Sequence, residues 1–165
     1  TDERFYGAEA ALTLPLSAHW SAGGSLAYTR GQFKDSSGTW RELNAYRATP
    51  LKSTLFGEWN NLTGQSVRLQ MLAIGGSDRA YDDSLKATYD SNVRATTAAK
   101  IQGYAVLDLI AQTELPQGKV NVGVYNVLNR EYQTVYSQEA EATYGKMSGI
   151  PAEGRTVAMS YSIDY

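Results

Sequence analysis

Apolar and polar residues alternate along much of the chain. The C-terminal end shows the pattern most clearly, because every second residue is apolar from Tyr165 back to Val157 and the residues between them are small or polar. A period of two places alternate side chains on opposite faces of an extended strand. Residues 154–165 are therefore predicted to contain a strand with one apolar face and one polar face.

The same period recurs in six further segments, and stretches with the helical period of 3.6 are hard to find. These segments are 5–14, 20–29, 54–60, 67–73, 105–115 and 119–126. Together with the terminal strand they predict an all-β antiparallel fold of about seven strands.

The connections between these strands alternate in length. Short turns are predicted near 16–19, 61–65 and 116–118. Long polar segments are predicted at about 31–47, 77–100 and 130–154. Short turns at one end of the strands and long loops at the other are typical of outer-membrane barrels, and loops of this length are usually functional or disordered.

Composition leaves two ways of burying the apolar faces. The chain has 165 residues, a net charge of −2, one histidine and no cysteine, so it offers no thiolate metal site, no disulfides and no basic surface for nucleic acid. No run approaches the roughly 20 apolar residues of a membrane helix, but transmembrane strands are only half apolar. Loop asymmetry and aromatic residues near strand ends favour a transmembrane β-barrel over a soluble barrel or sandwich. The predicted membrane-girdle aromatics are Trp20, Tyr28, Trp59, Tyr161 and Tyr165.

Three segments resemble the C-terminal part of TonB-dependent outer-membrane receptors. Residues 120–132, VNVGVYNVLNREY, resemble the penultimate-strand signature of this family, with Asn126, Asn129, Arg130 and Tyr132 at its polar positions. Residues 154–165 resemble the last strand, although phenylalanine is the commoner final residue. Residues 5–33, with Gly-x-Glu at Gly7, resemble a strand–turn–strand unit of the family.

This resemblance implies that the chain is the last third of a 22-stranded barrel, with the plug domain, the TonB box and the earlier strands upstream. Residues 1–165 would then be the C-terminal portion of the barrel domain, in the bacterial outer membrane with a periplasmic C-terminus. The implied partners are a ferric siderophore, the TonB complex acting through the plug, outer-membrane lipid and lipopolysaccharide, the barrel assembly machinery and the rest of the barrel. The assembly machinery would read a sorting signal at Val157, Met159, Tyr161, Ile163 and Tyr165.

The implied function is active uptake of a ferric siderophore, with iron present only in the cargo, no resident cofactor or metal site, and no catalytic residues. Residues 135–156 resemble ferric-aerobactin receptors, which implies a hydroxamate/citrate chelate. Loop residues that combine charge with aromatic contact area are the candidates for capturing it. They are Lys34, Trp40, Arg41, Tyr46, Arg79, Tyr81, Lys86, Tyr89, Arg94, Tyr136 and Tyr144. The acidic pairs Asp82/Asp83 and Glu139/Glu141 are interpreted as solvated loop polarity.

Two alternatives remain open at this point. A small autonomous outer-membrane barrel, acting as an adhesin or structural protein, would require an even number of strands. A soluble β-barrel binding protein would bury the apolar set instead of exposing it to lipid.

Overall fold

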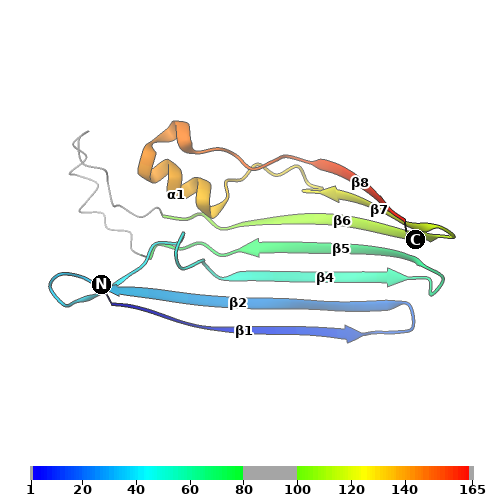
Figure 1. Cartoon of the computed structure of the whole chain (residues 1–165), viewed down its shortest axis with the longest axis horizontal. Coiled ribbons are helices and arrows are strands. Elements are labelled where there is room, and N and C mark those ends of the chain that lie inside the picture. The colour runs from blue at the N-terminus through cyan, green and yellow to red at the C-terminus, as the bar shows by residue number, and fades with distance from the viewer. Residues whose placement is uncertain (1, 80–99, 164–165) are drawn as a thin grey trace.

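The structure is a computed structural model that describes residues 2–79 and 100–163. These residues form one eight-stranded antiparallel sheet with a single α-helix near one end of the strands (Figure 1). The strands are β1 (Glu3–Pro15), β2 (Trp20–Lys34), β3 (Trp40–Glu42), β4 (Lys52–Asn60), β5 (Gln65–Ile74), β6 (Tyr104–Leu115), β7 (Gly118–Tyr125) and β8 (Thr156–Ser162). The helices are α1 (Val135–Tyr144) and the short 3₁₀ helix η2 (Lys146–Ser148).

The strands follow one another across the sheet in chain order. The order is β1-β2-β4-β5-β6-β7-β8, and β3 pairs only with the end of β2. The seven strands on this path are the seven predicted from the alternation, so the all-β fold class is confirmed. The three-residue β3 was not predicted, because its segment is too short to show a period. The sheet path starts at β1 and stops at β8, so each of these strands has one edge without a partner strand in the described part of the chain.

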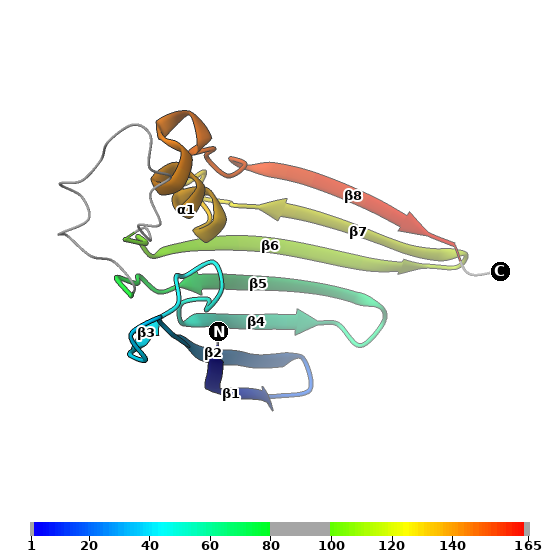
Figure 2. The ribbon, with the colours of Figure 1, turned by 60° about the vertical axis from the view of Figure 1, so that its left-hand side comes forward.

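The predicted alternation of short and long connections is also confirmed. The turns β1–β2, β4–β5 and β6–β7 lie at one end of the sheet, and the long connections lie at the other (Figures 1 and 2). In the β4–β5 turn the Oδ1 atom of Asn61 accepts hydrogen bonds from the backbone N–H groups of Thr63 (3.0 Å) and Gln65 (2.9 Å). Gly64 adopts φ +98°, which glycine reaches without steric cost. The side chain of Asn61 and the freedom of Gly64 thus close the turn.

One face of the sheet is apolar and exposed from one side of the sheet to the other. The register aligns apolar residues of neighbouring strands in rows, and large side chains in these rows stay open, such as Leu12 (61% exposed) and Met159 (75%). One row consists of Leu14, Ala22, Gly57, Leu69, Leu109, Val124 and Val157. The next row consists of Leu12, Gly24, Leu55, Met71 and Leu107. We call this surface the apolar face.

The opposite face carries hydrogen-bonded polar side chains. The hydroxyl groups of Ser25 and Thr54 are 2.6 Å apart across β2 and β4, and Arg68 of β5 forms an ion pair with Glu58 of β4 at 2.7 Å. The guanidinium of Arg68 also lies 4.3 Å from the ring centroid of Phe56. Such cross-strand pairs stabilise the sheet on this face, as the alternation predicts.

The buried core lies at the loop end of the sheet, and it combines residues of the long connections with Ile74 of β5 and Val106 of β6 on the face opposite the apolar face. Its apolar members are Leu43, Ala45, Ala48, Pro50, Ile74, Ile101 and Val106. Ala45 and Ile101 form a buried cluster, with Val135 and Ala142 of α1 packed against it. The core therefore fixes the loop end of the sheet, where the candidate ligand-binding residues lie.

The helix α1 lies in the third long connection and was not predicted. Thr134 caps its N-terminus by accepting a hydrogen bond from the backbone N–H of Ser137 (3.2 Å), and Gly145 ends it at φ +95°. Buried positions within it include the polar Ser137 and Glu139, so its sequence shows no apolar period of 3.6. No helix in residues 2–79 and 100–163 is long and apolar enough to cross a membrane.

Candidate functional site

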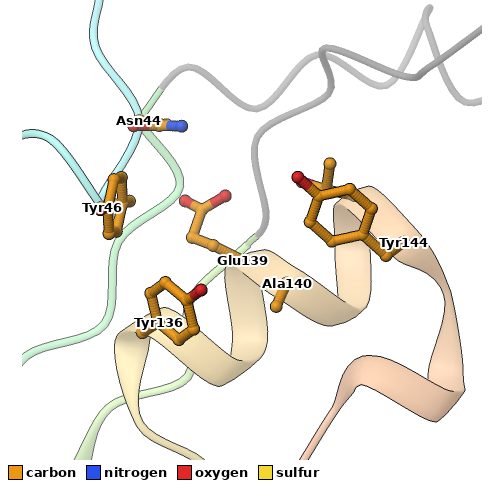
Figure 3. A pocket seen from close by; sticks show the side chains of 7 residues that line it. Asn44, Tyr46, Tyr136, Glu139, Ala140 and Tyr144 are labelled. Carbon is orange, nitrogen blue, oxygen red and sulfur yellow. The ribbon is translucent and has the colours of Figure 1, made fainter.

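Three of the predicted ligand-binding tyrosines surround one hollow at the loop end of the sheet. Tyr46 comes from the first long connection, and Tyr136 and Tyr144 come from α1 (Figure 3). The hollow has a volume of about 240 Å³. Its lining consists of Asn44, Tyr46, Tyr136, Glu139, Ala140, Thr143 and Tyr144. All three tyrosine rings are exposed, so they can contact a ligand without a rearrangement of the core.

Two of the rings contact each other across the hollow. The ring centroids of Tyr46 and Tyr136 are 5.5 Å apart, and the ring planes are tilted by 59°. The helical lining residues 136, 139, 140, 143 and 144 follow a spacing of three and four, which places them on one face of α1. This spacing is present in the sequence and could have indicated the helical side of the hollow, but not its contact with Tyr46.

Glu139 forms the base of the hollow and is not the solvated loop carboxylate that the sequence predicted. It is only 6% exposed, and its Oε1 atom accepts a hydrogen bond from the backbone N–H of Ala45 at 3.1 Å. The prediction was wrong because α1 turns Glu139 toward the first long connection, whereas alternation gave no helix there. This contact, together with the Ala45–Ile101 cluster, holds Tyr46 opposite α1.

The other candidates of the first long connection do not line this hollow. Lys34 ends β2 and faces Trp40 of β3 in the register, and the guanidinium of Arg4 lies 4.2 Å from the Trp40 ring centroid. Arg41 forms an ion pair with Asp35 at 2.7 Å. Hydrogen bonds from the Ser37 hydroxyl and the Arg41 guanidinium hold the pKa of the Asp35 carboxyl well below its usual range. These contacts organise the loop that β2 and β3 flank.

Arg79, from the second long connection, binds the sheet. Its Nη1 atom donates a hydrogen bond to the backbone carbonyl of Thr29 at 2.7 Å, and its guanidinium lies 5.0 Å from the ring centroid of Tyr28. The structure does not bring Arg79 to the hollow. The remaining candidates of this connection, Tyr81, Lys86, Tyr89 and Arg94, lie outside the described residues.

The predicted girdle aromatics fall into two groups. Trp20 and Trp59 lie opposite each other in the register, at the short-turn end, and the Tyr161 hydroxyl donates a hydrogen bond to the Gln117 carbonyl (3.1 Å) in a turn at the same end. Tyr28 lies inside β2 rather than at its end. It directly follows Ala27, the last residue of β2 that pairs with β4. Tyr165 lies outside the described residues.

The predicted sorting-signal residues form an exposed apolar row along β8. Val157, Met159 and Tyr161 face Val124, Val122 and Val120 of β7 in the register. Ile163 follows the strand and is also exposed. Whether these residues are read as a signal stays a prediction.

The chain resembles known proteins in sequence and in fold. No family model matches it. The ferric aerobactin receptors of Escherichia coli and Klebsiella pneumoniae are each 26% identical to it over 97% of the chain. The structure of the copper transporter OprC superimposes with a TM-score of 0.76 over 99% of the chain at 22% identity, a likeness of fold. The similarity to the two receptors agrees with the resemblance to TonB-dependent outer-membrane receptors that the sequence shows.

The resemblance stated from the sequence is confirmed at this level. The chain spans about a fifth of the length of the two aerobactin receptors and 24% of the copper transporter. The matched proteins are receptors and transporters rather than enzymes.

The signature that resembles the penultimate strand of TonB-dependent receptors has a structural explanation here. Asn126 and Asn129 both adopt left-handed conformations, at φ 50° and 51°, which asparagine tolerates better than most residues. The side chain of Asn126 accepts a hydrogen bond from the Arg130 N–H (2.9 Å) and donates to the carbonyls of Arg130 (2.9 Å) and Glu153 (3.3 Å). Asn129 accepts a hydrogen bond from the Arg155 N–H at 2.8 Å. The two asparagines thus join the beginning and the end of the connection that carries α1.

Proposed function

We propose that the chain forms the closing part of the barrel wall of an outer-membrane receptor that imports a ferric siderophore with energy supplied through TonB. The observation that carries the proposal is the combination of a continuous exposed apolar face with a tyrosine-lined hollow at the loop end of the same sheet. The similarity to two ferric aerobactin receptors supports the class of cargo.

The apolar face favours a position in lipid. One of its rows crosses all seven strands of the sheet path, and large side chains of the face remain exposed, whereas in a β-sandwich such rows pack against a second sheet. Backbone groups at an open strand edge have no hydrogen-bond partner in hydrocarbon, so a membrane-spanning sheet must close. The free edges of β1 and β8 therefore require further strands, which we assign to the rest of the same barrel.

The hollow offers the chemistry that an organic iron chelate requires. Three exposed tyrosine rings provide amphipathic contact area, and Asn44 and Thr143 provide polar groups. Cationic Lys146 follows closely after Tyr144 in the sequence, whereas the Arg47 guanidinium next to Tyr46 is bound to the Glu3 carboxylate by two hydrogen bonds of 2.7 Å. A hydroxamate/citrate chelate such as ferric aerobactin combines amide-like and anionic groups that match these side chains.

The remaining partners follow from the proposed family. The TonB complex would act through the upstream plug, the assembly machinery would insert the barrel in the outer membrane, and the C-terminus would lie in the periplasm. Iron would be cargo, and no resident cofactor or catalytic residue is proposed.

Replacing one ring of the hollow should weaken ligand capture without affecting the wall. We expect Tyr136→Ala in the full-length receptor to reduce the affinity for ferric aerobactin roughly tenfold, because an aromatic contact and its buried area are worth about 1–2 kcal/mol. Equilibrium binding by quenching of intrinsic fluorescence would measure the change.

Tyr6→Ala is the matched control, because Tyr6 is an exposed tyrosine on β1 and does not line the hollow. It should bind like the unaltered receptor. If Tyr136→Ala and Tyr46→Ala both bind ferric aerobactin with the affinity of the unaltered receptor, the hollow is not part of the ligand site. If the unaltered receptor binds no ferric chelate, the proposed cargo is wrong.

A further inference from the structure

The helix α1 bonds to two other connections through two consecutive residues. Glu139 accepts the hydrogen bond from the backbone N–H of Ala45, in the first long connection. The preceding residue, Gln138, bonds instead to Gln102, in the connection between β5 and β6. Successive residues of a helix lie about 100° apart around its axis, so α1 can hold both connections at once.

The side-chain amide of Gln138 pairs with the backbone of Gln102 as a neighbouring strand would. Its Oε1 atom accepts a hydrogen bond from the Gln102 N–H at 2.7 Å, and its Nε2 atom donates to the Gln102 carbonyl at 3.0 Å. The same Nε2 atom donates to the carbonyl of Gln133, also at 3.0 Å. Among side chains of this length, a carboxamide alone offers both a donor and an acceptor at neutral pH.

The backbone that Gln138 holds belongs to the core of the loop end. Ile101, next to Gln102, forms an isolated β-bridge with Ser77, with hydrogen bonds of 2.7 and 3.0 Å. Its side chain forms the buried cluster with Ala45, against which Val135 and Ala142 of α1 pack. Gln138 therefore fixes α1 to a segment that other contacts already hold.

Gln138 is not part of the tyrosine-lined hollow. It lies two positions after Tyr136 and two before Ala140, which is about half a turn from both. It lines a separate hollow of about 420 Å³. The ionisable residues that line this second hollow are Tyr104, Arg130, Glu131 and Tyr132. An effect of the Gln138 amide on a ligand in the tyrosine-lined hollow must therefore pass through the position of α1.

We propose that Gln138 is a positioning residue for ligand capture, an inference that rests on the proposed function. Its bonds to Gln102 hold α1 where Tyr136 and Tyr144 surround one hollow with Tyr46 (Figure 3). The three rings come from two connections, so the hollow keeps its shape only while α1 keeps its place. A ligand binds only the fraction of receptor in which the site is formed, and the apparent affinity falls with that fraction.

The test measures binding of ferric aerobactin by the full-length receptor with Gln138→Met and with Gln138→Glu. Methionine has a similar length but no strong donor or acceptor, so we expect the affinity to fall roughly fivefold at every pH. A glutamate carboxylate still accepts from the Gln102 N–H but repels the two carbonyl oxygens, so a similar loss is expected at neutral pH.

The pH profile of Gln138→Glu distinguishes the amide pairing from a general disturbance of the helix. A carboxyl group that faces carbonyl oxygens is protonated more readily than a free one, and its O–H then donates as the amide did. The affinity of Gln138→Glu should therefore recover toward that of the unaltered receptor as the pH falls toward about 5. The reference is the pH profile of the unaltered receptor, which carries the same neighbouring ionisable groups. These are Tyr104, Arg130, Glu131, Tyr132, Glu139 and Glu141.

The matched control is Gln102→Glu. The side chain of Gln102 lines the same hollow, whereas the bonds to Gln138 come from its backbone. This variant adds the same charge without breaking the pairing and should bind like the unaltered receptor at each pH. In a receptor that already carries Tyr136→Ala, Gln138→Met should cost less affinity than in the unaltered receptor, because the two residues act through one site.

Hydrogen exchange without ligand tests the position of α1 independently of the cargo. The amides of Gln102 and of α1 should exchange faster in Gln138→Met than in the unaltered receptor. The proposal is overturned by unchanged exchange, by unchanged affinity in both variants, or by a loss in Gln138→Glu that does not depend on pH. A full loss that persists beside Tyr136→Ala would also overturn it. Failure of the proposed function looks different: the unaltered receptor would bind no ferric chelate, while exchange would still respond to Gln138→Met.

Discussion

Leu69→Arg is expected to destabilise the full-length receptor by about 2–4 kcal/mol, the cost of an arginine facing the middle of a bilayer. Leu69 lies in the middle of β5, between Gly57 and Leu109 in its row, and is 47% exposed. A guanidinium there loses water and gains no described partner in the row. Urea titration of the receptor folded into lipid vesicles measures the free energy of unfolding.

The matched control is Gln70→Arg, one residue further along the same strand and on the opposite face. Gln70 lies opposite Asp108, and its Nε2 atom donates to that carboxylate at 3.3 Å. An arginine at this position gains an anionic neighbour, so we expect a change within about 1 kcal/mol. Equal destabilisation by both variants would mean that the two faces of β5 do not differ in their contact with lipid.

Asn126→Ala is expected to cost about 2–4 kcal/mol and to loosen the connection that carries α1. Asn126 is 5% exposed, and its removal takes the side-chain partner from the N–H of Arg130 and from the carbonyls of Arg130 and Glu153, in part-buried hydrogen bonds. An unsatisfied buried group costs about 1–3 kcal/mol, and alanine at positive φ adds about 1 kcal/mol. Hydrogen exchange of the Arg130 amide should accelerate, and ligand affinity should fall with it.

Asn126→Gly separates the two causes, because glycine accepts φ 50° without strain but makes none of the side-chain hydrogen bonds. It should recover about 1 kcal/mol relative to alanine. Asn121→Ala, in the strand β7 that precedes Asn126, is the control, since its described side-chain bond is a single 3.3 Å contact with Ser160. Unchanged exchange at Arg130 in Asn126→Ala would contradict a structural role for this asparagine.

The strands and their faces could be predicted because alternation is a local property. Leu55 and Phe56 are an example. They are consecutive apolar residues, and only the period of two assigns Leu55 to the apolar face and Phe56 to the polar face, under Arg68. The turn chemistry of Asn61 and Gly64 is equally local. Hydrophobic patterning and turn residues therefore determined the wall.

The hollow could not be predicted in the same way because it depends on contacts between distant segments. Tyr46 meets Tyr136 only because Glu139 bonds to Ala45, across 94 positions of the chain, and because Ile101 packs against both segments. The sequence selected Tyr46, Tyr136 and Tyr144 by residue type, but it gave no reason for them to share one site. It also assigned no structure to α1, whose buried face includes polar residues.

The central claim is that the apolar face lies in lipid, and nitroxide accessibility measures this directly. Single spin labels at positions 66 to 73 of β5, in the full-length receptor in outer membranes, would be tested for collisions with oxygen and with a water-soluble nickel reagent. We predict maxima of oxygen accessibility at 67, 69, 71 and 73. At the positions between them we predict either high accessibility to nickel, as for a label that faces water, or low accessibility to both reagents, as for a label buried in protein. A constant accessibility along β5, or maxima at 66, 68, 70 and 72, would contradict the account.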